Sequence, residues 1–84
     1  MRWLDEDGQS VAEVPVGYHR MRLEVMQRWL SEEWAVSVLL IGGRREMVTL
    51  RMERAESREA GKVAALAMAR AWVGEAVQGL GGVE

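Results

Sequence analysis

The sequence contains no cysteine, phenylalanine or asparagine, and only one proline and one histidine. Without cysteine the chain can form no disulfide and offers neither a thiol nucleophile nor a thiolate metal ligand. The single histidine, His19, cannot build a zinc site of several imidazoles within one chain. The hydroxyl side chains stand at no recognised catalytic spacing from a base. We therefore expect no metal, no cofactor and no enzymatic activity.

A charge excess of one sign and long apolar runs are missing as well. The net charge is −2 and the pI about 5.4, so no bulk positive field draws the chain to nucleic acid or to an anionic membrane. No apolar run approaches the roughly 18 residues that a membrane span needs. The acidic start MRWLDEDG is unlike a signal peptide. We expect a cytoplasmic protein without membrane contact.

The basic residues are almost all arginine, with Lys62 as the only lysine. This bias indicates a GC-rich bacterial genome. The scarcity of thermolabile side chains together with abundant Glu and Arg would also suit a thermophile, although six methionines argue against it.

The chain is short and apolar for its size. It has 84 residues, four tryptophans and a hydrophobic fraction of 49%. One domain of this length has a marginal core, and this much apolar material is difficult to cover within one copy. The composition favours association with a second chain.

The N-terminal region predicts a weak hairpin over residues 1–17. Residues 5–8, DEDG, favour a turn, and Pro15 makes the second arm an edge strand or irregular. Residues 18–30 fit either a strand or a helix. We favour a strand, because a helix would place basic residues at its start and acidic residues at its end, against the macrodipole.

Residues 34–41 and 45–54 predict two further strands, separated by Gly42 and Gly43. For the apolar side chains of these two strands to share one face of the sheet, the loop between them must contain an odd number of residues. The same condition predicts a four-residue loop over 30–33 between the strand of residues 18–30 and the strand of residues 34–41. The expected pairs are Trp29 with Trp34, Val25 with Val38, Leu23 with Leu40, Trp34 with Met52, Val36 with Leu50, and Val38 with Val48.

Residues 57–78 predict a helix that is apolar around most of its circumference, with Ser57 as N-cap, Gly79 as stop and a flexible tail over 79–84. A strip of alanines is expected to face the sheet. One flank then lacks cover, and we expect it to meet a second copy, unless the N-terminal hairpin covers it. The strip is Ala60, Ala64, Ala67 and Ala71; the flanks are Val63, Leu66, Val73 and Val77 on one side, and Met68 and Trp72 on the other.

The sheet face turned away from the helix is the second candidate surface. Its apolar centre and arginine margins are typical of a protein interface, although an ordinary solvated face is the alternative. The expected face holds Arg20, Arg22, Glu24, Met26, Arg28, Ala35, Ser37, Leu39, Ile41, Arg45, Met47, Thr49, Arg51 and Glu53. The candidate interface residues are Met26, Leu39, Ile41 and Met47 on the sheet, and Leu66, Val73 and Val77 on the helix.

Nucleic-acid binding through the same face is an alternative. Its candidate contacts are Arg20, Arg22, Arg28, Arg44, Arg45 and Arg51. A helix after antiparallel strands is also the layout of some dimeric single-strand-binding folds. The surplus of positive charge is small, however, and with Trp29 and Trp34 expected in the core the face offers no aromatic platform for bases. The sequence Gly42-Gly43-Arg44-Arg45 lacks the features of a P-loop and predicts a hairpin tip.

Two stretches, DEDGQSVAEVP and RAESREAGKVAALA, resemble pieces of HicB-type antitoxins. In that family an acidic-Gly turn leads into a VAxVP-like strand, and a helix begins with a Ser/Thr and Glu-Ala pattern. The family continues from that strand through a Pro-Gly turn into the helix, whereas here VGYHRMRLEVM and two further strands follow. The resemblance implies one form of the regulatory alternative.

These patterns predict an α+β domain over residues 1–84. It consists of an antiparallel meander of three main strands within residues 18–54, a weak N-terminal hairpin, and one C-terminal helix packed on one face. We expect a small homodimeric regulatory or adaptor protein that acts through contacts with a protein partner. The alternative is a nucleic-acid-binding regulator, including an antitoxin-like protein, that uses the arginine-rimmed face.

Overall fold

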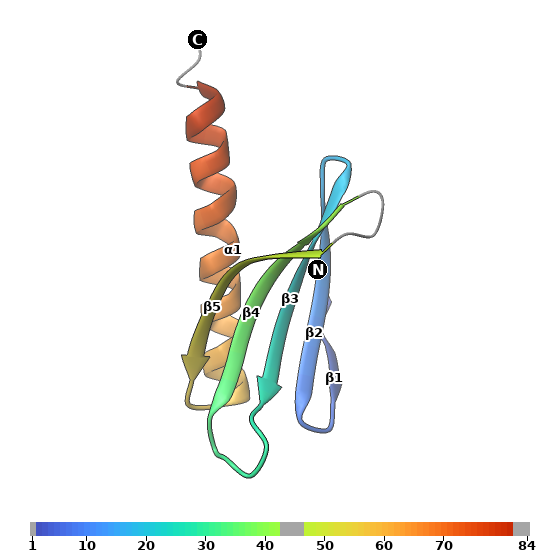
Figure 1. Cartoon of the computed structure of the whole chain (residues 1–84), viewed down its shortest axis with the longest axis vertical. Coiled ribbons are helices and arrows are strands. Elements are labelled where there is room, and N and C mark those ends of the chain that lie inside the picture. The colour runs from blue at the N-terminus through green and yellow to red at the C-terminus, as the bar shows by residue number, and fades with distance from the viewer. Residues whose placement is uncertain (1, 43–46, 82–84) are drawn as a thin grey trace.

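The computed structural model describes residues 2–42 and 47–81, with side chains in the helix described as far as Val73. Five strands form one antiparallel sheet in sequence order, and a single helix packs on one of its faces (Figure 1). The α+β meander with a C-terminal helix is confirmed, including the strand assignment of residues 18–30. The elements are β1 (Leu4–Glu6), β2 (Gln9–Val16), β3 (His19–Gln27), β4 (Trp34–Ile41), β5 (Met47–Ala55) and α1 (Arg58–Gly81).

The core lies between α1 and the two central strands, β3 and β4. Every second residue of these strands points at the helix, as the period of a strand requires. Ser57 begins the helix as predicted, because its Oγ accepts a hydrogen bond from the Ala60 amide at 3.1 Å. The buried apolar cluster consists of Met21, Leu23, Val25, Val36, Val38, Ala65 and Met68.

Small residues allow the helix to approach the sheet closely at its first turns. Gly61 is buried, and a Cβ at that position would stand 2.5 Å from Cγ1 of Val25. The predicted alanine strip is placed wrongly: Ala60, Ala67 and Ala71 are exposed on the outer side of α1, and Ala64 is only half-buried. Helical spacing puts Gly61, Ala65 and Met68 on one side, which leaves these alanines on the other.

The pairing of β3 with β4 differs from the expected one by two residues. Val25 pairs with Val36 and Leu23 with Val38, so the connecting loop covers residues 28–33. A shift of two residues leaves every side chain on its expected face. It does remove Trp29 from the sheet, and this side chain, predicted to be buried, is 90% exposed.

A bulge at Leu50 changes the faces along β5. Val38 pairs with Arg51 whereas Leu39 pairs with Thr49, so Leu50 is the extra residue. The expected pairs of Trp34 with Met52, Val36 with Leu50 and Val38 with Val48 are wrong, because the bulge adds one residue to a register that is already shifted by two. Beyond the bulge the faces invert: Arg51 and Glu53 lie on the helix side, and Met52 and Arg54 take their places on the open face. Ile41 pairs with Met47, so the connection has the odd length that was predicted.

The N-terminal hairpin is tied to the helix by a polar cluster. Asp5 on β1 accepts a hydrogen bond from the buried Ser10 hydroxyl at 2.6 Å and lies 2.9 Å from Lys62 Nζ. Arg58 donates to Ser10 Oγ at 3.2 Å. β1 pairs only with Gln9–Val11, so Pro15 lies where β2 has no strand on that side.

The helix backbone continues to Gly81, two residues beyond the predicted stop at Gly79. A glycine costs about 1 kcal/mol in a helix relative to alanine and does not by itself end it. The end of α1 extends past the strands that it packs against (Figure 1). The predicted tail is therefore partly helical, and residues 82–84 lie outside the described residues.

Candidate functional site

An apolar groove runs between the middle of α1 and the β2–β3 hairpin. Its volume is about 520 Å³, and its lining is almost entirely hydrocarbon, with Arg70 as the one charged side chain. The groove brings together the predicted flank residues Leu66 and Val73, whereas the side chain of Val77 is outside the described part. The lining consists of Val14, Val16, Met21, Leu23, Leu66, Ala69, Arg70 and Val73.

The N-terminal hairpin forms the floor of this groove and does not close it. Val14 and Val16 lie beneath the flank, yet Val73 remains exposed. The outer side of α1 is uncovered as well, with Val63 69% exposed and Ala67 exposed between Val63 and Ala71. The described part of α1 therefore carries apolar surface that the other described residues leave open to solvent.

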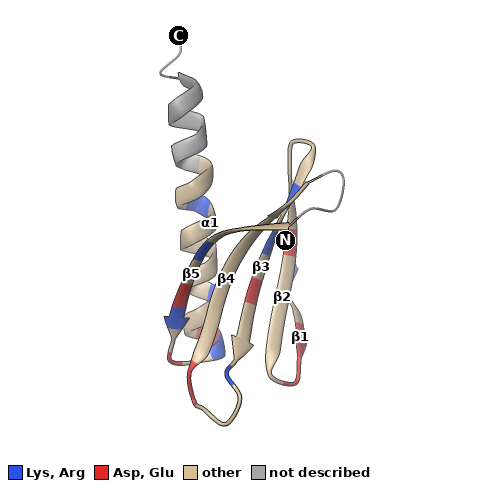
Figure 2. Ribbon diagram, viewed as in Figure 1, with Lys and Arg blue, Asp and Glu red and all other residues tan. Residues whose placement is uncertain are grey.

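Charges are sparse on this side of the helix. Figure 2 shows charged residues gathered near the start of α1 and along the strands, with little colour on the described part of the helix beyond Arg70. Glu59 and Arg70 lie on the same stripe as Val63 and Leu66, at helical intervals of three and four residues. Arg70 forms no ion pair among the described residues.

The open face of the sheet, which is turned away from α1, carries the four candidate interface residues predicted on the sheet: Met26, Leu39, Ile41 and Met47. Arg22 pairs with Leu39, Arg20 with Ile41 and Ile41 with Met47, and Met26 lies on the same face. Leu39 is only 9% exposed, so it is a poor contact residue for a partner. Met52 is exposed here, and sequence reasoning missed it because the bulge at Leu50 has no sequence signature.

Two arginines of this face, Arg20 and Arg22, are paired with carboxylates. Arg20 lies 3.4 Å from Glu13, and Arg22 lies 3.7 Å from Glu13 and 3.4 Å from Glu24. Arg51 is on the helix side of β5, which contradicts its expected place on the open face. Arg28 belongs to the β3–β4 loop, and Arg44 and Arg45 lie outside the described residues. The described basic residues thus form no continuous positive surface.

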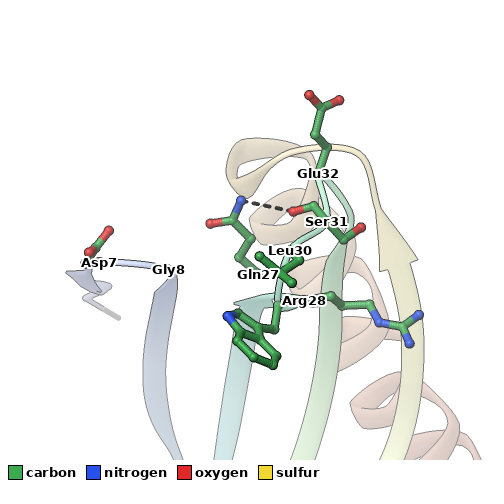
Figure 3. Close-up of a pocket in the computed structure, with 8 residues that line it drawn as sticks. Asp7, Gly8, Gln27, Arg28, Leu30, Ser31 and Glu32 are labelled. Carbon is green, nitrogen blue, oxygen red and sulfur yellow. Dashed lines mark hydrogen bonds between the residues drawn. The ribbon is translucent and has the colours of Figure 1, made fainter.

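A second pocket lies at the end of the sheet where the β1–β2 turn faces the β3–β4 loop (Figure 3). Its volume is about 510 Å³, and Asp7, Gly8, Gln27, Arg28, Trp29, Leu30, Ser31 and Glu32 line it. Trp29 and Leu30 are 90% and 89% exposed. Sequence reasoning missed this site because it placed Trp29 in the core. The loop predicted over residues 30–33 already included Leu30, but it began too late to include Trp29, because the loop in the structure covers residues 28–33.

The polar cluster that ties β1 to α1 perturbs one titrating group. The pKa of the Asp5 carboxyl lies below its usual value of 3.8, because Lys62 and then Ser10 hydrogen-bond to the ionised form. Asp5 is partly exposed, and its neighbours satisfy it within the fold. This arrangement holds β1 in place and presents no reactive group.

The described residues contain no group of three or more His, Asp or Glu side chains placed to hold a metal ion. Within that same part of the chain, no helix combines the length and the apolar character needed to cross a membrane.

Comparison with protein-family models, with curated proteins and with solved structures finds no match to this chain. The local resemblance to HicB-type antitoxins gains no support from these comparisons. Any function must therefore be argued from the surfaces themselves.

Proposed function

We propose that the protein is a non-enzymatic homodimeric binding protein of the regulatory or adaptor kind, which acts through contacts with another protein. The observation that carries the proposal is the uncovered apolar flank of α1, from exposed Val63 to the groove at Leu66 and Val73. A small protein gains most from covering such a surface permanently. A second copy offers the same flank in return, as a two-fold interface requires.

The charges on the flank specify how two helices pair. In an antiparallel pair centred between Ala64 and Ala65, Val63 stands opposite Leu66 of the second copy. The same register sets Glu59 opposite Arg70 of the second copy, and the two-fold axis repeats both contacts. The small side chain of Ala67 beside this seam allows close approach. Apolar contacts supply the stability, and the rim charges mainly fix the register.

Size-exclusion chromatography with light scattering tests this arrangement. Val63→Asp places two carboxylates near the two-fold axis, so we expect the particle mass to fall to that of one chain. The matched control is Ala71→Asp, an exposed position about 80° around the same helix from Val63 and away from the Glu59–Arg70 stripe, which should keep the mass of the wild type.

A charge swap tests the register independently. Glu59→Arg and Arg70→Glu should each raise the dissociation constant several-fold, because each creates a like-charge contact. The double variant Glu59→Arg/Arg70→Glu should restore the wild-type value. A Val63→Asp variant that keeps the wild-type mass would contradict the proposed interface.

The nucleic-acid alternative receives less support from the geometry. Arg20 and Arg22 of the open face lie within ion-pair distance of Glu13 and Glu24, and Arg51 is on the other face. Titration with labelled single- and double-stranded oligonucleotides separates the two ideas. Binding that weakens steeply with salt would favour the alternative over a protein partner.

A further inference from the structure

Hydrogen bonds hold the β3–β4 loop in one defined shape. The Arg28 amide donates to the Glu33 carbonyl at 2.9 Å, and the Ser31 amide donates to the Arg28 carbonyl at 3.1 Å. The Gln27 side chain donates to the Ser31 carbonyl at 3.2 Å (Figure 3). The Gln27 amide also donates to the Gly8 carbonyl at 2.8 Å, which fixes the loop relative to the β1–β2 turn. The two walls of the pocket are therefore positioned before any ligand arrives.

This loop presents two adjacent large apolar side chains to solvent. Trp29 and Leu30 lie within the pocket lining and are almost fully exposed. Leu30 has a φ of 58°, in the left-handed region that a leucine adopts only at a cost. Folding stability is therefore not a reason for a leucine at this position. Tryptophan is the residue most enriched among those that dominate binding energy in protein interfaces.

The surroundings of the pair are acidic. Asp7 on the turn and Glu32 on the loop line the pocket, and neither forms an ion pair among the described residues. The one basic lining residue, Arg28, lies 3.4 Å from Glu33 and points away from the turn that carries Asp7 (Figure 3). A cationic ligand is attracted to such a rim, whereas phosphate groups are repelled.

We propose that this pocket docks an extended segment of another protein in which a lysine or arginine stands beside an aromatic or aliphatic side chain. The apolar side chain packs on Trp29 and Leu30, and the cation lies beside one of the two carboxylates of the lining, Asp7 or Glu32. The inference rests on the protein-binding role proposed above and names the chemistry of the partner. The pocket is separate from the flank of α1, so docking does not need the dimer.

Selection from a phage-displayed library of random peptides, with the full chain as target, provides a defined probe. The most enriched peptide is then synthesised with a fluorescent label, and its binding is measured by anisotropy at low and moderate salt. We expect enriched peptides to carry basic residues next to aromatic or aliphatic ones. The double variant Trp29→Ser/Leu30→Ser should weaken binding at least tenfold. Asp7→Asn/Glu32→Gln should weaken it several-fold and flatten its salt dependence.

Tyr18→Ser is the matched control, since Tyr18 is a fully exposed aromatic residue in the β2–β3 turn and lines neither pocket. It should leave the affinity unchanged, and circular dichroism checks that every variant is folded. The proposal is overturned if selection enriches no peptide, if the enriched peptides are acidic, or if they bind the Trp29→Ser/Leu30→Ser variant as tightly as the wild type. The Val63→Asp monomer should still bind the peptide, so failure of the dimer and failure of the pocket are separate results.

Discussion

Both sides of α1 carry apolar residues, but only the side that faces the sheet is buried. Toward the sheet, Gly61, Ala65 and Met68 are buried under β3 and β4. Away from it, Val63 and Ala67 face solvent, and Leu66 borders an open groove. One sheet can cover only one side of a helix. The apolar residues on the other side of α1 therefore stay exposed in a single copy of this fold.

The largest effect is expected on the covered side. Leu23 is completely buried, and Leu23→Ala should lower the free energy of unfolding by about 2–5 kcal/mol, through lost apolar burial and the cavity left behind. Urea unfolding followed by tryptophan fluorescence at one fixed protein concentration measures it. Val48→Ala, at an exposed position on β5, is the control and should change stability by at most about 0.5 kcal/mol. Equal losses in the two variants would contradict the assigned core.

Gly61→Ala compares the buried and the exposed side of α1 within one turn of the helix. The added Cβ would collide with Val25, so we expect a loss of about 1–3 kcal/mol despite the better helix propensity of alanine. The converse change on the outer side, Ala60→Gly, should cost only the propensity difference of about 1 kcal/mol. A stabilising Gly61→Ala would show that α1 does not approach the sheet closely at this point.

A smaller effect is expected at the polar link between β1 and α1. The pKa of Asp5 is lowered in the folded protein, so its carboxylate stabilises the fold above its usual pKa of 3.8, and this contribution is lost as the pH falls through the lowered value. Asp5→Asn should therefore be less stable than the wild type at neutral pH, and the gap should close in acid. Urea unfolding of the wild type and of Asp5→Asn over a pH series measures this gap.

The smallest effect on folding is expected at Trp29. Trp29→Ser should change the free energy of unfolding by no more than about 0.5 kcal/mol, because the side chain is exposed. Trp34→Ser should cost clearly more, since Trp34 packs against the core and Arg58 lies 5.0 Å from its ring. Thermal unfolding of both variants decides the comparison. A large loss for Trp29→Ser would place this residue in the core, as the sequence pattern suggested.

The periodic parts of the fold could be predicted from the sequence. The alternation of Met21, Leu23 and Val25 predicted a strand and its buried face correctly, and Ser57 marked the start of the helix. The exact pairing could not be predicted, because a shift of two residues leaves the faces unchanged and so leaves no trace in the pattern. The bulge at Leu50 moves the following side chains of β5 to the opposite faces of the sheet, and the alternation of apolar residues in the sequence does not indicate it.

The candidate surfaces were predictable to different degrees. Leu66 and Val73 could be assigned to an uncovered flank because the helix has more apolar residues than one contact side can use. The pocket at Trp29 and Leu30 could not be predicted, because a tryptophan beside a strand is expected to be buried in the core. The alanine strip was assigned to the wrong side, since small size alone does not say which neighbour a helix approaches.

The mass of the wild-type particle in solution is the most direct test of the central claim. Light scattering on a sizing column, repeated over a wide range of protein concentrations, should give twice the 9.5 kDa of one chain, with dissociation only on dilution. A particle of one chain mass at every concentration would contradict the account, because the flank at Val63, Leu66 and Val73 would then be stable while exposed to water.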